Sequence, residues 1–280
     1  MCGNKLLAIL ETELETPKPY GFFHLSWLLV TIAVIILLFI IRKRNTERQL
    51  KCILGVYSII ALVLEVLKQI IWAVEYNNVT NTFVWDYQWY AFPFQLCTMP
   101  IYICLICLFL KKNWLRDSLL AFVAYTTILG SIASAIIPDA LFVSDVLVNV
   151  HAMWLHLGSL VVSVYLLMSK EVAINRNSLL SAVAVFLAAV IVASILNISI
   201  YNSGILNEET FNMFYISPYF DSTLPVFDVI YKSVPYPVFL ITYIFALSLG
   251  SYIIFIIAKV IEITTNHKKR VEKNIKMKVG

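Results

Sequence analysis

Seven long apolar stretches follow one another along this chain, and they limit what it can fold into. A bilayer core about 30 Å thick takes about 20 helical residues to cross, and every stretch reaches or approaches that length. Hydrophobic residues make up 60% of the chain and charged residues 14%, which leaves too little polar surface for a water-soluble globule. We therefore predict an all-α polytopic membrane helix bundle with seven transmembrane helices. The helices are expected at about 21–41, 52–74, 93–110, 117–137, 148–169, 178–200 and 236–262.

The basic residues alternate along the chain in step with these stretches. Lys and Arg accumulate on cytoplasmic loops of membrane proteins. Of the 21 basic residues, 17 lie after the first, third and fifth stretches or at the C-terminal end. This pattern predicts an outside N-terminus, a cytoplasmic C-terminus and a multi-pass protein of the plasma membrane. The net charge of +4 then favours anchoring against anionic lipid and gives no indication of nucleic-acid binding.

The same pattern divides the chain into three parts. Residues 1–20 are expected to form an extracytoplasmic segment, residues 21–262 the membrane domain, and residues 263–280 a basic cytoplasmic tail. Residues 201–235 form the longest loop and are rich in aromatics and prolines. Such a loop would expose much apolar surface if it were free in water, so we predict a packed cap over the outer mouth of the bundle. Glycine-rich phosphate loops and metal-ligand spacings are not found, so no cofactor and no metal are expected.

Ionisable groups within the stretches are costly and mark candidate sites, because a charge at membrane depth costs about 2.5 to 3.5 kcal/mol. Glu65 and Lys68 are spaced i, i+3, so they share one helix face and can form an ion pair. With a rise of about 1.5 Å per residue, Cys97, Lys68, His156 and Glu65 fall roughly 8 to 14 Å below the outer surface, and His151 lies above them. The sequence thus predicts a polar pocket in the outer half of the bundle. Its substrate-binding residues are predicted to be Glu65, Lys68, Gln95, His151, Asn197 and Tyr243.

Cys97 is the candidate nucleophile of this pocket. A thiol becomes reactive when a nearby cation or base favours the thiolate. His156 can act as that base, with His151 as the alternative, and Lys68 or Gln95 can stabilise an oxyanion. Spacing alone leaves a structural role open as well, since a buried cysteine also packs as a small hydrophobe.

Several short motifs occur in order along the chain: Phe92–Cys97, Gly130 with Pro138-Asp139, His156-Leu157-Gly158, Asn197, Asn212–Tyr215 and Pro218. Together they resemble the motifs of the YwaF-type integral membrane family of bacteria, whose vertebrate relatives include a transmembrane acyltransferase that remodels ether phospholipids. The resemblance implies Cys97 as the acyl-carrying nucleophile and His156 as its partner. Gln95 stands where the family usually has a histidine, and Leu157 separates His156 from Gly158.

Three classes of function are compatible with these residues. The first is a membrane-embedded acyltransferase or lipid ester hydrolase that acts on phospholipid acyl chains at the outer leaflet through a Cys-His pair, with membrane lipids as partners. The second is a transporter or ligand-binding membrane module whose polar site includes Glu65, Lys68 and the histidines. A seven-helix receptor is a third class, but the inner loops are short and the last stretch has no mid-membrane lysine for retinal.

Overall fold

The computed structural model describes residues 12–41, 47–77, 80 and 82–279. Within these residues, six helices are long and apolar enough to cross a membrane. They are α2 (Phe22–Ile41), α3 (Glu47–Ile71), the run Trp114–Ile136, α7 (Val146–Met168), α8 (Arg176–Asn202) and α10 (Tyr236–Val279). Each coincides with one of the predicted stretches, and together they make the protein a multi-pass membrane protein. Its orientation in the membrane stays a prediction.

The third predicted stretch, 93–110, is helical over a shorter length than expected. Its helix is α4 (Met99–Phe109), and the residues before it form a turn. Pro93 has no backbone N–H, and its carbonyl accepts hydrogen bonds from the hydroxyls of Thr98 (3.2 Å) and Tyr102 (2.8 Å). A helix of 11 residues is only about 16 Å long, which is shorter than the hydrocarbon core. A seventh crossing through α4 therefore stays a prediction.

The fourth stretch contains a widened turn at its centre. Helix α5 (Trp114–Phe122) continues through the π-helical turn η3 (Val123–Thr127) into α6 (Ile128–Ile136). All five residues of η3 are buried. The wider turn changes the backbone pairing, and the Val123 carbonyl accepts the hydroxyls of Thr127 (3.0 Å) and Ser163 (2.9 Å).

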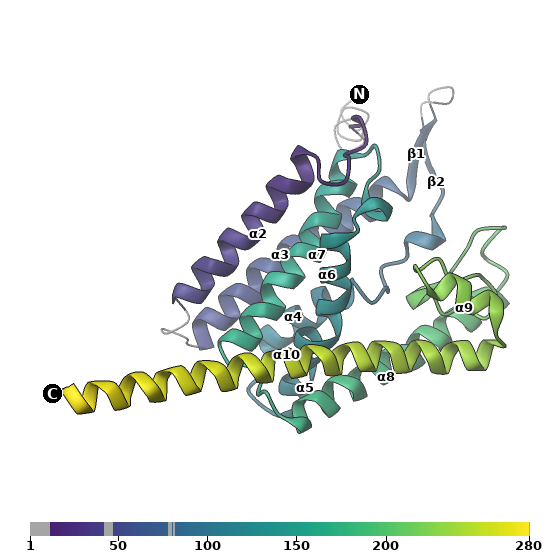
Figure 1. Cartoon of the computed structure of the whole chain (residues 1–280). Coiled ribbons are helices and arrows are strands. Elements are labelled where there is room, and N and C mark those ends of the chain that lie inside the picture. The colour runs from purple at the N-terminus through teal and green to yellow at the C-terminus, as the bar shows by residue number, and fades with distance from the viewer. Residues whose placement is uncertain (1–11, 42–46, 78–79, 81, 280) are drawn as a thin grey trace.

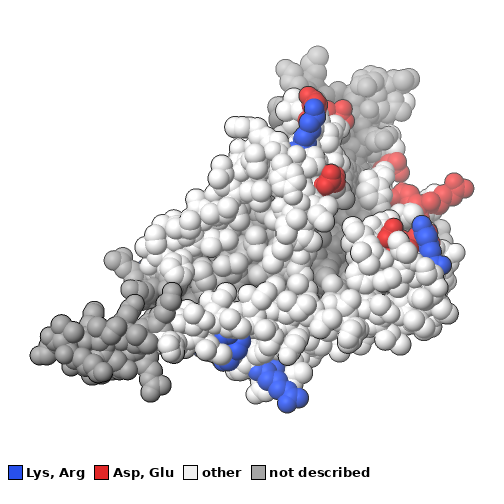
Figure 2. All heavy atoms as spheres, in the orientation of Figure 1, with Lys and Arg blue, Asp and Glu red and all other residues white. Residues whose placement is uncertain are grey.

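The helices form two groups. Helix α7 packs against α2, α3 and α6, whereas α8 packs against α5 and α10 crosses near η3 (Figure 1). The C-terminal part of α10 projects beyond the bundle, so the predicted basic tail continues this helix as far as Val279 (Figure 1). Figure 2 shows a wide uncharged surface between charged side chains near the ends of the molecule, as expected for a face in contact with lipid.

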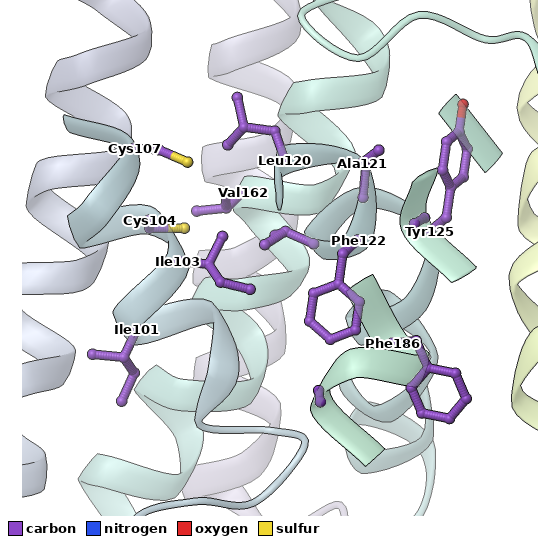
Figure 3. Packing of buried hydrophobic residues seen from close by; sticks show 14 of the residues in the cluster. Ile101, Ile103, Cys104, Cys107, Leu120, Ala121, Phe122, Tyr125, Val162 and Phe186 are labelled. Carbon is purple, nitrogen blue, oxygen red and sulfur yellow. The ribbon is translucent and has the colours of Figure 1, made fainter. Parts of the chain in front are cut away.

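The core lies between α3, α4, α5, α7 and α8. Cys104 and Cys107 are fully buried there, and their sulfur atoms point toward Leu120 and Val162 (Figure 3). Both cysteines therefore pack as small hydrophobic residues. At the opposite end of α4 from Cys97, the Arg116 guanidinium holds both carboxylate oxygens of Glu47 at 2.7 and 2.9 Å, which fastens α5 to the start of α3.

Short elements cover one end of the bundle. The two antiparallel strands of a hairpin follow α3, with Val74 paired to Trp85, so the all-α fold carries a small sheet. Residues 203–235 fold back over the bundle beside this hairpin, on the right of Figure 1. We call these residues the cap. The short elements are β1 (Val74–Asn77), β2 (Thr82–Trp85), η2 (Trp89–Ala91), η4 (Asp139–Leu141), η5 (Met213–Tyr215) and α9 (Phe227–Ser233).

Candidate functional site

Cys97 lies in the turn that precedes α4. The Thr98 hydroxyl fixes this turn, because it accepts from the Gln95 N–H at 3.0 Å and lies 2.9 Å from the Gln95 carbonyl. The thiol is partly buried, and the backbone N–H groups of Cys97 and Thr98 point to its sulfur. These donors, at the N-terminal end of a helix, stabilise negative charge on sulfur.

A buried charge cluster joins α3 to α7. The Glu65 carboxylate lies 2.7 Å from Lys68 Nζ and 2.8 Å from His151 Nε2. It also accepts a hydrogen bond of 2.8 Å from the Gln69 amide. At most 10% of any of the three ionisable side chains is exposed, so their charges interact with little screening by water. Glu65 is therefore the centre of the cluster.

The cluster continues outward to the segment that follows the hairpin. Gln69 donates to the Ala91 carbonyl (2.7 Å) and accepts from the Tyr87 hydroxyl (2.9 Å). Burial, with the charges of Glu65 and Glu209, raises the pKa of Tyr87, which keeps its hydroxyl protonated as a donor. Sequence reasoning did not identify Gln69 or Tyr87. The i, i+4 spacing of Gln69 from Glu65 was the available signal.

The thiol of Cys97 lies within electrostatic range of this cluster. Lys68 favours a negative charge on the Cys97 sulfur, and Glu65 opposes it. Tyrosines from four parts of the fold lie within electrostatic range of the same thiol. They are Tyr57 of α3, Tyr102 of α4, Tyr215 of the cap and Tyr243 of α10. Among the predicted residues, Glu65, Lys68 and Tyr243 are therefore within electrostatic range of Cys97, and His151 contacts Glu65.

Two predicted site residues hold the cap instead of facing an open pocket. The Gln95 amide donates to the Asn212 carbonyl (3.0 Å) and accepts from the Phe214 N–H (2.8 Å). The Asn197 amide makes the same pair of bonds to the backbone of Met213, at 3.0 and 2.7 Å. We call these four bonds the amide clamp. They fasten the Met213–Tyr215 turn to α8 and to Gln95, two residues before Cys97 in the chain.

The clamped turn has an unfavourable backbone conformation. Phe214 and Tyr215 both have φ of 58°, in the left-handed region that non-glycine residues rarely adopt. Such residues cost of order 1 to 3 kcal/mol each and persist only where the surroundings hold them. The amide clamp, together with the stacked rings of Phe94 and Phe214, supplies that restraint.

Removing one arm of the clamp is expected to loosen the cap. Asn197→Ala leaves the buried N–H of Met213 unpaired, at about 1 to 3 kcal/mol, and leaves its carbonyl only the Ile216 N–H at 3.4 Å. We expect a lower free energy of unfolding in SDS titrations and faster proteolysis within the cap. Asn202→Ala, at the exposed end of the same helix, is the matched control and should change neither. Equal stability of the two variants would show that the clamp does not hold the turn.

His156 lies on a different side of α7 from the Glu65 contact. Its Nδ1 is 3.0 Å from the Ser134 hydroxyl of α6. Among the described residues, no hydrogen bond joins His156 to Cys97. His24 is buried at the start of α2, where it accepts the Tyr20 N–H at 3.1 Å.

The fold and the site define a multi-pass membrane protein with a buried cluster of carboxylate, ammonium group and imidazole, a partly buried thiol within electrostatic range of the first two, and a cap held by two amide side chains. The chain belongs to the TMEM164 family, whose model matches residues 19–255. Comparisons with curated proteins and with solved structures gave no match. The resemblance to the bacterial YwaF-type family stays a prediction.

Proposed function

We propose that this protein is a membrane-embedded acyltransferase that moves a phospholipid acyl chain through a thioester on Cys97, at the outer leaflet. One observation carries the proposal: the Cys97 thiol lies at a helix N-terminus within range of the Lys68 charge. Both features favour a thiolate, whereas burial opposes it, so the sulfur needs a base to take its proton. A cysteine with a packing role alone, such as Cys104, needs neither.

The base that the geometry favours is His151. Its imidazole is oriented by Glu65, and the same Glu65 lies within range of Cys97. A carboxylate that orients an imidazole is also how acyl-transfer enzymes on many folds hold their base. His156, the partner implied by the family resemblance, is instead hydrogen-bonded to Ser134 and stays the alternative.

The reaction balances with two lipids and no cofactor. The Cys97 sulfur attacks the ester carbonyl carbon, the thiol proton passes to His151, and the Lys68 ammonium stabilises the oxyanion. The ester C–O bond breaks, and the leaving lipid hydroxyl takes the proton from His151. The hydroxyl of a second lipid then attacks the thioester and gives its proton to His151; the C–S bond breaks, and the departing Cys97 sulfur takes that proton to become a thiol again. Water in place of the second lipid would give hydrolysis.

Transfer between two lipids tests this proposal. The purified full-length protein is incubated with a phospholipid that carries an isotope-labelled acyl chain and with an unlabelled lysophospholipid. We expect label in the acceptor with the wild type and none above background with Cys97→Ala. Cys104→Ala is the matched control and should retain transfer. Equal transfer by wild type and Cys97→Ala would exclude the thioester route and favour a solute-binding role for Glu65 and Lys68.

A further inference from the structure

An apolar groove of about 240 Å³ lies between α2, α3 and α7. Its rim is formed by Val30 of α2 and Val56 of α3, whose side chains are 56% and 52% exposed. Its floor includes the buried side chains of Tyr57 and Val162. All three helices are long and apolar enough to cross the membrane, so the groove opens toward the hydrocarbon of the bilayer.

Three polar side chains along the groove already have partners. The Thr31 hydroxyl donates to the Trp27 carbonyl (2.8 Å), and the Trp154 indole donates to the Tyr57 carbonyl (3.2 Å). The Tyr57 hydroxyl donates to the Leu155 carbonyl (3.3 Å). The lining is otherwise almost entirely apolar, so a ligand in the groove gains mainly by contact with apolar atoms. Hydrocarbon satisfies that condition.

The shape of the groove fits an unbranched chain. On α2 its lining extends from Trp27 to Leu38, which is roughly 16 Å along the helix axis. Gly158 of α7 preserves its width, because a Cβ there would lie 2.9 Å from the Tyr57 ring and would push this ring out of place. The groove is thus long, narrow and parallel to the membrane-spanning helices.

Tyr57 separates the groove from the site of Cys97. Its ring forms part of the groove floor, whereas its hydroxyl is buried on the core side and is within electrostatic range of Cys97. We propose that the groove binds one acyl chain of a membrane phospholipid. This inference rests on the proposed function for its role, since the bound chain would belong to the lipid whose ester reaches Cys97.

Photo-crosslinking tests the site without relying on turnover. The full-length protein in nanodiscs is irradiated with a phosphatidylcholine that carries a diazirine in one acyl chain, and the labelled peptides are mapped by mass spectrometry. We expect label on the groove-lining parts of α2, α3 and α7. Val30→Trp and Val56→Trp fill the groove and should each reduce that label by about tenfold, or about 1.4 kcal/mol in affinity.

The control is Ile36→Trp, which adds the same side chain at a 54% exposed position of α2 outside the groove lining and should leave the label unchanged. Label spread equally over all lipid-facing surfaces, or undiminished in both groove variants, would indicate ordinary boundary lipid and overturn the proposal. Cys97→Ala separates the two proposals. If Cys97→Ala loses transfer but its groove is still labelled, the groove binds an acyl chain independently of the reaction at Cys97. If a groove variant loses the label but keeps transfer, the groove proposal is refuted and the thioester proposal is not.

Discussion

His151→Gln is expected to reduce acyl transfer by roughly 10²- to 10⁴-fold, the usual contribution of a positioned general base. Glutamine can still pair with Glu65, so the contact between α3 and α7 is kept, while the group that accepts the Cys97 proton is lost. His156→Gln is the matched variant, because glutamine can also keep the bond to Ser134. We expect a much smaller loss there.

The readout is the initial rate of label transfer at saturating lipid, with the free energy of unfolding measured in parallel. A structural role for His151 would lower stability and rate together, whereas loss of the base lowers the rate alone. If His156→Gln proved the more damaging variant at unchanged stability, His156 would be the base and our assignment of His151 would be wrong.

Lys68→Met is expected to destabilise the protein by about 3 to 5 kcal/mol, because it leaves the buried Glu65 carboxylate without its ammonium partner. The double variant Glu65→Gln with Lys68→Met removes both charges, while the new amide can still bond to His151 and Gln69. It should recover most of that loss. SDS unfolding of the wild type, Glu65→Gln, Lys68→Met and the double variant gives the coupling energy between Glu65 and Lys68.

Lys18→Met provides the comparison for an exposed pair. Lys18 lies 3.5 Å from Glu15, but its side chain is 80% exposed, and such pairs contribute little. A loss for Lys68→Met no larger than for Lys18→Met would mean that water reaches the Glu65 cluster. It would also contradict the low local polarity that lets the Lys68 charge stabilise negative charge on the Cys97 sulfur.

Hydropathy and local spacing predicted the parts of this fold that depend on nearby residues. The six long helices follow from apolar stretches, and the i, i+3 spacing of Glu65 and Lys68 predicted an ion pair that the structure has at 2.7 Å. The predicted start of the third helix, at residue 93, was wrong by six residues, because α4 begins at Met99. The Pro93 turn is stabilised by side-chain hydroxyls, which an average over an apolar window does not detect.

The roles within the site depended on distant contacts. Gln95 and Asn197 were predicted as substrate-binding residues, but their partners in the cap lie elsewhere in the sequence, so the amide clamp could not be predicted. Depth along a helix placed His151 and His156 near one layer, but it does not give the direction of a side chain. Only the packing of α7 between α3 and α6 distinguishes the Glu65 contact of His151 from the Ser134 contact of His156.

The acyl adduct on Cys97 tests the central claim most directly. The purified protein is incubated with the labelled donor phospholipid without an acceptor, and its intact mass is measured before and after treatment with neutral hydroxylamine, which cleaves thioesters. We predict one added acyl chain, mapped to Cys97, that hydroxylamine removes and that Cys97→Ala lacks. An unmodified Cys97 in a protein that still transfers label, or an adduct on another residue, would contradict a thioester at this site.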